Sequence, residues 1–211
     1  ELEIANFVQA LGHEYVLHDR TTIVPLELDL YIPSQQVAIE YHGLYWHSGG
    51  HSGEYDKLAH RKKFLACTER GIKLIQIFGD EWENKREICE SMIRSRLNSA
   101  TTKINARDCE FIKLNSIDGR LFLAKTHIDG AANSKVYFGL RHDNTLVAVI
   151  SVRAVQAKKY SNVLEISRMA FVNNAIVRGG ASKMIKHVYE WCRNQGYDGL
   201  LTYADLRFGT G

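Results

Sequence analysis

The chain has 211 residues, and its 45% hydrophobic content is enough to bury one large core or two small ones. It has no run of about 18 apolar residues and no cationic leader with a cleavage site, so we expect an intracellular, non-secreted protein without a membrane span. The four cysteines are widely scattered and form no CxxC pair, which predicts reduced thiols and no structural zinc. Because the chain starts at Glu1 and stops after "DLRFGTG", we expect a fragment of something longer.

Charge divides the chain into two halves. Residues 1–100 carry 11 Lys+Arg against 15 Asp+Glu, a net charge of −4, and residues 101–211 carry 16 against 9, a net charge of +7. A basic half can be the electrostatic footprint of a nucleic-acid-binding domain, although a solvated surface explains a modest excess equally well. The asymmetry therefore predicts two domains and leaves the partner of the second one open.

In the first half, hydrophobic spacing predicts the element order α-β-β-α-β-α. "ELEIANFVQALG" has helical spacing, and "LELDLYIP" and "QVAIEYHG" alternate as the two strands of a hairpin. A helix over residues 55–70, the apolar strand "IKLIQIF" and the helix "DEWENKREICESMIRSRL" follow. We expect this domain to span residues 1–100.

The hairpin concentrates the residues that could do chemistry. Side chains alternate along a strand, so Glu40 and His42 point to one face, and Asp29 on the partner strand can face the same way. Two carboxylates and an imidazole would then meet on one sheet surface, and carboxylate oxygens suit Mg²⁺ or Mn²⁺. If Asp29 does share this face, Asp29 and Glu40 would form a site that suits Mg²⁺ or Mn²⁺ better than zinc.

These motifs resemble the very-short-patch-repair endonucleases and related phage and bacterial homing endonucleases, which share a PD-(D/E)xK nuclease core. The resemblance covers roughly residues 1–98 and rests on "ELDLYIP", "IEYHGLYWHS", "AHRKKFLACTERGIKLIQIF" and "DEWENK". His60 lies where the repair enzymes carry an acid and the homing relatives carry histidine, which favours the homing branch.

The resemblance also implies roles for individual residues. The implied catalytic residues are Glu1, Asp29, Glu40, His42, His47 and His60. Among these, either His42 or His47 is expected to activate water or to support the scissile phosphate, and His47 is favoured as the general base. Tyr45 and Trp46 could stack on bases, with core packing as the alternative, and Lys63 is a candidate DNA contact.

The second half has a different rhythm. "EFIKL" is a predicted strand, "DGRLFLAKTHI" a helix, and "KVYFGLRHDNTLVAVISVRAV" a hairpin turning at residues 142–145. The strand "NVLEISRMAFV", a helix opened by a glycine pair, and the strand "YDGLLTYAD" complete the pattern after a linker at residues 101–109. This order, with "RMAFVNNAIVRGGASK" and "TYADLRFGTG", resembles acetyltransferases of the GNAT type, closest to a phage Mom-like branch. We expect this domain, C-terminally incomplete, at residues 110–211.

In such acetyltransferases, a Gly-rich loop at a helix start cradles the pyrophosphate of coenzyme A. The candidate loop here consists of Arg178, Gly179, Gly180, Ala181 and Ser182. The domain could transfer acyl groups, bind DNA or serve only the structure. The candidate DNA contacts on the edge of its hairpin are Arg153, Lys158 and Lys159.

The sequence thus predicts an α/β (α+β) protein with a PD-(D/E)xK core followed by a partial GNAT-like mixed sheet. The favoured function is that of a Mg²⁺-dependent endonuclease acting on double-stranded DNA, of the phage homing type. One alternative is a nucleic-acid-modifying acyltransferase that uses coenzyme A and carries a nuclease-like module. The other is a DNA-binding protein whose nuclease core is inactive.

Overall fold

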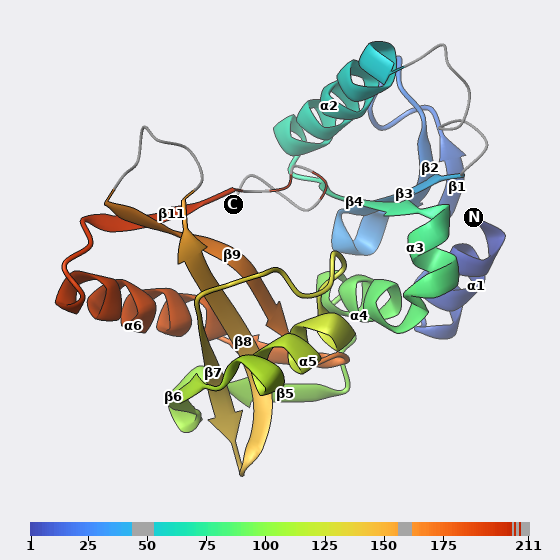
Figure 1. Cartoon of the computed structure of the whole chain (residues 1–211). Helices are drawn as coiled ribbons and strands as arrows, with labels where there is room; N and C mark the ends of the chain where they lie inside the picture. Colours follow the sequence, from blue (N-terminus) through green and yellow to red (C-terminus); the bar gives the residue numbers. More distant parts are fainter. Residues whose placement is uncertain (44–52, 156–161, 204, 206, 208–211) are drawn as a thin grey trace. The chain divides into compact units, whose positions relative to one another are not determined.

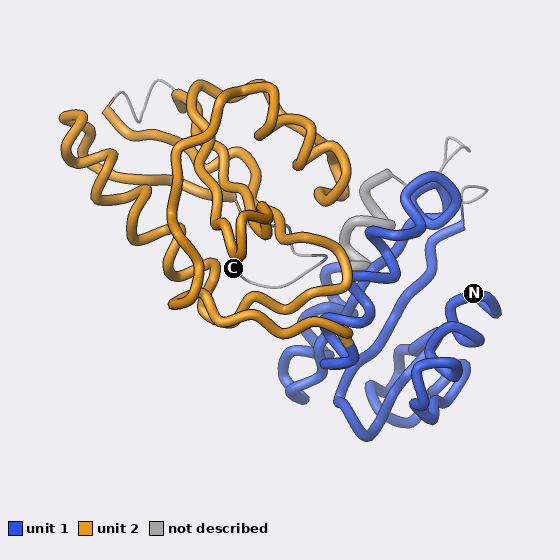
Figure 2. The backbone as a smooth tube through the Cα atoms, turned by 90° about the horizontal axis from the view of Figure 1, so that it is seen from below, with its two compact units in different colours: residues 1–99, 204–211 blue, residues 100–203 orange. Residues whose placement is uncertain are grey.

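The computed structural model describes residues 1–43, 53–155, 162–203, 205 and 207, with the backbone alone for residues 53–60 (Figure 1). The chain forms two compact units (Figure 2). Unit 1 comprises Glu1–Ser99 with Ala204–Gly211, and unit 2 comprises Ala100–Tyr203.

Unit 1 is built on a four-stranded sheet with the order β1-β2-β3-β4. The strands are β1 (Val16–Asp19), β2 (Leu28–Ile32), β3 (Val37–His42) and β4 (Lys73–Phe78), and a 3-10 helix, η1 (Pro33–Gln35), turns β2 into β3. The helices are α1 (Leu2–Ala10), α2 (Gly53–Glu69), α3 (Gly79–Asn84) and α4 (Arg86–Arg96). β2 pairs antiparallel with β1 and β3, whereas β3 and β4 are parallel because α2 carries the chain across.

Alternation along the strands gives the sheet of unit 1 two apolar faces. One face packs against α2, where Phe64 and Cys67 meet Tyr31, Ala38 and Leu74. Residues of the opposite parity point to the other face, where Figure 1 shows α1, α3 and α4. The sheet is thus covered on both faces, and Glu40 and His42 at the end of β3 are polar residues on a mostly apolar face.

Unit 2 is built on a five-stranded sheet with the order β11-β9-β8-β7-β6. Its strands are β6 (Glu110–Leu114), β7 (Val136–His142), β8 (Thr145–Ala154), β9 (Val163–Phe171) and β11 (Gly199–Thr202), and its helices are α5 (Ser116–Thr126) and α6 (Gly180–Asn194). A separate two-stranded parallel sheet joins β5 (Thr102–Asn105) to β10 (Ala175–Arg178), and the 3-10 helix η3 (Ala106–Asp108) follows β5.

The two helices of unit 2 pack on opposite faces of its large sheet. Met184, Val188 and Cys192 of α6 belong to a core cluster with β7, β8 and β9. Leu123 of α5 packs on the other face with Tyr137, Val149 and Ala170. The Cβ of a non-glycine residue at position 119 would lie 2.5 Å from the Tyr137 ring, so Gly119 is what allows α5 to approach the sheet closely.

The predicted mixed α/β class is confirmed, as are the antiparallel pairing of β2 with β3 and that of β7 with β8. Three short strands, β1, β5 and β10, were not predicted. The helix predicted after β4 is broken at Lys85 into α3 and α4, and the residues expected to form a linker contain β5 and η3.

The four cysteines are free and buried, in agreement with the prediction of reduced thiols. Burial raises the pKa of the Cys67 and Cys192 thiols to about 11, so both stay protonated at neutral pH. Within the described part of the chain, every helix is too short or too polar to cross a bilayer.

Candidate functional site

Two regions of the structure carry candidate chemistry, and the first is the carboxylate pair of unit 1. The backbone N–H of Asp29 donates to Glu40 Oε1 at 3.1 Å, and the backbone N–H of Tyr41 donates to Asp29 Oδ2 at 2.9 Å. Each carboxylate is therefore held by the backbone of the opposite strand, just beyond the register pair Leu30 and Ile39. The predicted convergence of Asp29 and Glu40 is what the structure shows.

Glu40 is buried, and its protonation is set by its surroundings. Burial and, second, the negative charge of Asp29 raise the pKa of Glu40 to about 7, against the opposing effect of Lys63. Lys63 on α2 donates a hydrogen bond from Nζ to Glu40 Oε2. In the structure this ammonium is the counter-ion of the buried carboxylate, and a DNA contact by Lys63 stays a prediction.

His42 lies two residues after Glu40 and shares its face of β3. Its Nε2 is 3.2 Å from Gln76 Oε1 on the neighbouring strand, and its ring lies 5.1 Å from the Phe78 ring. Unit 1 therefore displays two carboxylates and an imidazole on the adjacent strands β2 and β3, with the ammonium of Lys63 on α2 bonded to one of the carboxylates. These groups can hold a hard cation and move a proton.

The described residues of unit 1 include no group of three or more His, Cys, Asp and Glu side chains that could enclose a metal ion. Mg²⁺ commonly binds through one or two carboxylates and retains several waters, so Asp29 and Glu40 fit it as a partial ligand set. The remaining ligands would be water or nucleic-acid phosphate.

The other predicted site residues of unit 1 are Glu1, which lies beside β1, and a group outside the described residues. Glu1 Oε1 is 3.4 Å from Nε2 of His18, a residue of β1. Tyr45, Trp46 and His47 fall within residues 44–52, which are outside the described part of the chain. His60 belongs to α2, but its side chain is likewise outside the described residues.

The second candidate region is the place where β9 and β11 of unit 2 part. Their parallel pairing runs from Val163 with Gly199 to Ile166 with Thr202. β9 continues to Phe171, five residues beyond the last pair. On its other side, β9 stays paired with β8 as far as Phe171. Within residues 162–203, β9 beyond Ile166 has no pairing with β11 along this edge, and an unpaired strand edge can take up a further extended chain.

The predicted glycine loop lies next to this edge. Gly179, the N-cap of α6, has a φ of +75°, a conformation that favours glycine. A Cβ at Gly180 would lie 2.5 Å from Cε1 of Phe171, the last residue of β9, so the helix start is seated against the end of that strand. The first turn of α6 contains no acidic residue, and backbone N–H groups at the start of a helix can bind phosphate. Arg178, Ala181 and Ser182 flank the glycine pair.

Comparison with known families identifies this arrangement. The family model "Acetyltransferase (GNAT) family" matches residues 101–207, just over half of the chain. The chain belongs to the acetyltransferase (GNAT) family. The GNAT match begins within the expected linker, so β5 and η3 fall inside the acetyltransferase segment.

Comparison with solved structures gives weaker likenesses. The catalytic domain of the homing endonuclease I-Bth0305I aligns with 47% of this chain and 95% of its own, at 17% identity and a TM-score of 0.36. The C-terminal (DUF2156) domain of a protein described as a lysylphosphatidylglycerol synthetase from Agrobacterium fabrum covers 93% of this GNAT chain and 72% of its own, at 14% identity and a TM-score of 0.35. Neither likeness is close enough to bear on function. No curated protein matches the chain in sequence.

The sequence analysis did not predict the buried polar residue Glu165 in the acetyltransferase unit. Glu165 is buried on β9, and its Oε1 accepts hydrogen bonds from Arg153 Nε at 3.1 Å and Nη2 at 2.7 Å. Arg153 was predicted to contact DNA, and the structure places it in this ion pair, while Lys158 and Lys159 lie outside the described residues. The signal was present in the strands, because "ISVR" and "EISR" put charged and hydroxyl side chains at interior positions of an apolar sheet.

Proposed function

We propose that unit 2 binds acetyl-CoA and transfers its acetyl group to an amine. The observation that carries this proposal is the meeting of the open edge of β9 with the glycine-capped start of α6. The pyrophosphate of coenzyme A would lie on the N–H groups of the first turn of α6. The pantetheine arm contains two amides, and an extended amide-bearing chain can pair with an open strand edge.

The proposed transfer is a simple exchange at the acyl carbon. The nitrogen of the acceptor attacks the thioester carbonyl, the new C–N bond forms, and the C–S bond breaks. The nitrogen loses a proton, and coenzyme A leaves as the thiol. The proposed role of unit 2 is to bind the donor and fix its orientation, since positioning of the reactants supplies a large share of the barrier reduction.

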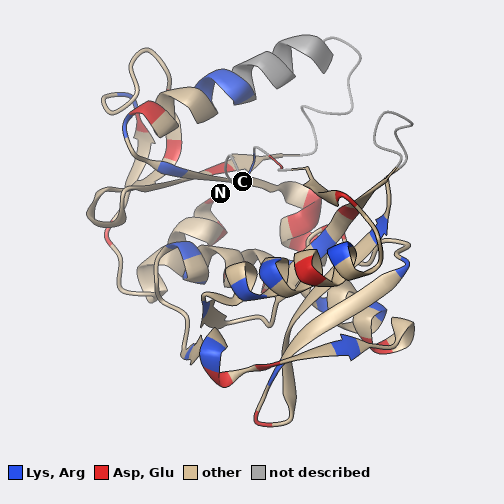
Figure 3. Cartoon of the chain, turned by 90° about the vertical axis from the view of Figure 1, so that its left-hand side faces the viewer, with Lys and Arg blue, Asp and Glu red and all other residues tan. Residues whose placement is uncertain are grey.

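We infer that the acceptor is an amine of double-stranded DNA. Residues 101–211 carry a net charge of +7, which favours a polyanionic partner. Lys and Arg are interspersed with Asp and Glu along the helices and strands (Figure 3), so the support comes from net charge rather than from one basic face. Transfer of labelled acetyl groups to DNA should weaken as salt rises, because phosphate contacts release counterions.

Coenzyme A binding tests the donor site directly. The change Gly180→Ala places a methyl group 2.5 Å from the Phe171 ring, so the start of α6 or the end of β9 must move. We expect the Kd for coenzyme A, measured by isothermal titration calorimetry, to rise at least about tenfold. The matched control is Gly199→Ala, because a Cβ at Gly199 meets nothing within 4 Å. If the unmodified chain fails to bind coenzyme A, the proposed function is refuted.

A second function is proposed for unit 1, the metal-dependent hydrolysis of phosphodiester bonds in DNA. The specific observation in its favour is the interlocked pair Asp29 and Glu40, with His42 on the same face. Asp29 and Glu40 would hold Mg²⁺ or Mn²⁺, and the ion when bound would activate water and neutralise the phosphate. The proposed roles of the remaining groups are proton transfer for His42 and charge balance at Glu40 for Lys63.

Plasmid nicking in the presence of Mg²⁺ tests this second function. Asp29→Asn removes one charge from the pair, and we expect the nicking rate to fall by at least about a hundredfold. Glu14→Gln, a change at an exposed acid between α1 and β1, is the control and should nick at the unmodified rate. Undiminished nicking by the Asp29 variant would exclude the carboxylate pair as the catalytic centre.

A further inference from the structure

The strand that forms the proposed donor edge contains a β-bulge at Ser167. Ser151 pairs with Arg168 and the next residue, Val152, pairs with Ile166, so Ser167 is the extra residue of β9. The packing shows the same shift, because Leu164 and Ile166 face the α6 core before the bulge and Met169 and Phe171 face it afterwards. The bulge lies where the pairing with β11 ends, at Ile166 and Thr202.

Three hydroxyl groups surround this bulge and bond to one another. This hydroxyl cluster consists of Ser134, Ser151 and Ser167. Ser134 Oγ is 2.6 Å from Ser167 Oγ and 3.1 Å from Ser151 Oγ, and the last two are 2.9 Å apart. Ser167 Oγ also donates to the Ser151 carbonyl at 3.2 Å. The three hydroxyl hydrogens therefore serve four contacts, three between hydroxyl oxygens and one with the Ser151 carbonyl. Each hydroxyl has a hydrogen-bond partner within the cluster, although Ser151 and Ser167 are buried.

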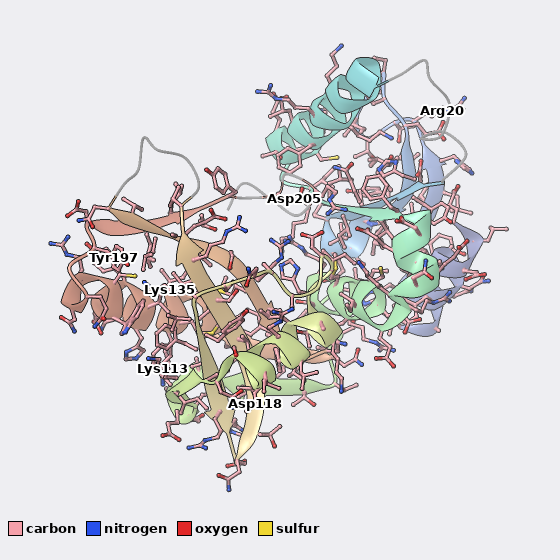
Figure 4. All side chains as sticks on the ribbon, viewed as in Figure 1. Arg20, Lys113, Asp118, Lys135, Tyr197 and Asp205 are labelled. Atoms are coloured by element: carbon pink, nitrogen blue, oxygen red, sulfur yellow. The ribbon has the colours of Figure 1, made fainter. Side chains whose placement is uncertain are left out.

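Further contacts fix the strand and the loop on either side of the cluster. Arg168 Nη1 donates to the Ser167 carbonyl at 2.8 Å, so a side chain takes up a backbone acceptor at the bulge. Lys135, labelled in Figure 4, follows Ser134 and donates its backbone N–H to the Val152 carbonyl at 2.8 Å. The segment before β7 is therefore anchored to β8 beside the cluster. Where the bulge interrupts the backbone hydrogen bonds between β8 and β9, the side-chain hydroxyls and this backbone contact provide hydrogen bonds instead.

We propose that the hydroxyl cluster is a positioning device that holds the bulge of β9, so that the edge from Arg168 to Phe171 stays open for the pantetheine arm of coenzyme A. This inference rests on the proposed acetyl-CoA function of unit 2. A bulge whose polar groups lose their partners is costly in a buried strand. If the bulge were lost, the register of β9 would shift by one residue, and every backbone group on the donor edge would then point in the opposite direction.

The test compares two ligands that differ in the arm. Coenzyme A carries the pantetheine arm, whereas adenosine bisphosphate carries the nucleotide without it. For Ser167→Ala, we expect the Kd for coenzyme A to rise about tenfold while the Kd for adenosine bisphosphate changes by less than about twofold. Ser134→Ala leaves the Ser151–Ser167 contact in place and should give a smaller loss in the same direction.

Controls separate positioning from loss of the fold. Ser167→Thr keeps a hydroxyl and should restore coenzyme A binding, and Ser116→Ala, at the exposed start of α5, should change neither Kd. If Ser167→Ala does not fold, Ser134→Ala carries the test alone. Equal losses for the two ligands, or unchanged binding of coenzyme A, would overturn the inference. A failure of the unmodified chain to bind coenzyme A would instead refute the proposed function.

Discussion

At the residue scale, Glu40 links the geometry of unit 1 to a measurable property. Its pKa in the folded chain is about 7, raised from 4.5 by burial and by Asp29. Between these two pH values the folded state binds the proton more tightly than the unfolded state, so stability falls as pH rises. We expect the free energy of unfolding to drop on the order of 3 kcal/mol between pH 4.5 and 7 from this group, and to level off above that range.

Urea unfolding at a series of pH values checks this expectation. Glu40→Gln removes the titrating group, so the variant should lack the decline that the unmodified chain shows between pH 4.5 and 7. Glu83→Gln changes an exposed carboxylate on α3 and should keep the decline. An identical decline in the Glu40 variant would show that another group is responsible.

The sequence was informative about this residue only in part. Strand alternation placed Glu40 and His42 on one face of β3, because the side-chain period of a strand is two, whereas the shared face of Asp29 depends on the register of β2 with β3. It could not place Lys63, since the contact with Glu40 depends on how α2 docks on the sheet and not on any local pattern. From the sequence alone, a lysine on a helix is expected to be solvated, whereas Lys63 contacts the buried carboxylate of Glu40.

At the element scale, predictability followed the length and regularity of the hydrophobic pattern. β2, β3 and β4 have strong alternation or continuous apolar runs, whereas β5 and β10 are four residues each and pair across about seventy residues of chain. The bulge in β9 had a visible signal, because the apolar positions step from Leu164 and Ile166 to Met169 and Phe171 with one extra residue between them. That break in alternation is what could have revealed the end of the β9–β11 ladder.

The glycine pair at the start of α6 is a weak signal in the sequence and a specific one in the fold. Short glycine motifs occur often by chance. In the fold, Gly179 takes a left-handed conformation and Gly180 meets the Phe171 ring, so each glycine has a separate physical requirement. The candidate loop gains meaning from the strand end beside it.

At the scale of the whole molecule, each unit has its own hydrophobic core. The cluster around Phe64 and Cys67 contains only residues of unit 1, and those around Met184 and Leu123 contain only residues of unit 2. The charge division between the two halves of the sequence follows a similar boundary. The change of net charge near residue 100 thus coincides with the boundary between the two compact units, but charge could not show which of the proposed activities each unit carries.

Separate cores and separate candidate sites predict that the two proposed activities respond independently to substitution. Asp29→Asn should lower the nicking rate by at least about a hundredfold and leave the Kd for coenzyme A within about twofold of the unmodified value, because the effects of substitutions without shared partners are independent. Gly180→Ala should weaken coenzyme A binding and leave the nicking rate within the same limit. Calorimetry and plasmid nicking on the two variants and on the double variant measure this. A change of coenzyme A affinity in the Asp29 variant would mean that the proposed nuclease and acetyltransferase sites are energetically coupled. The same conclusion would follow if the free-energy change in the double variant departed from the sum of the changes in the two single variants.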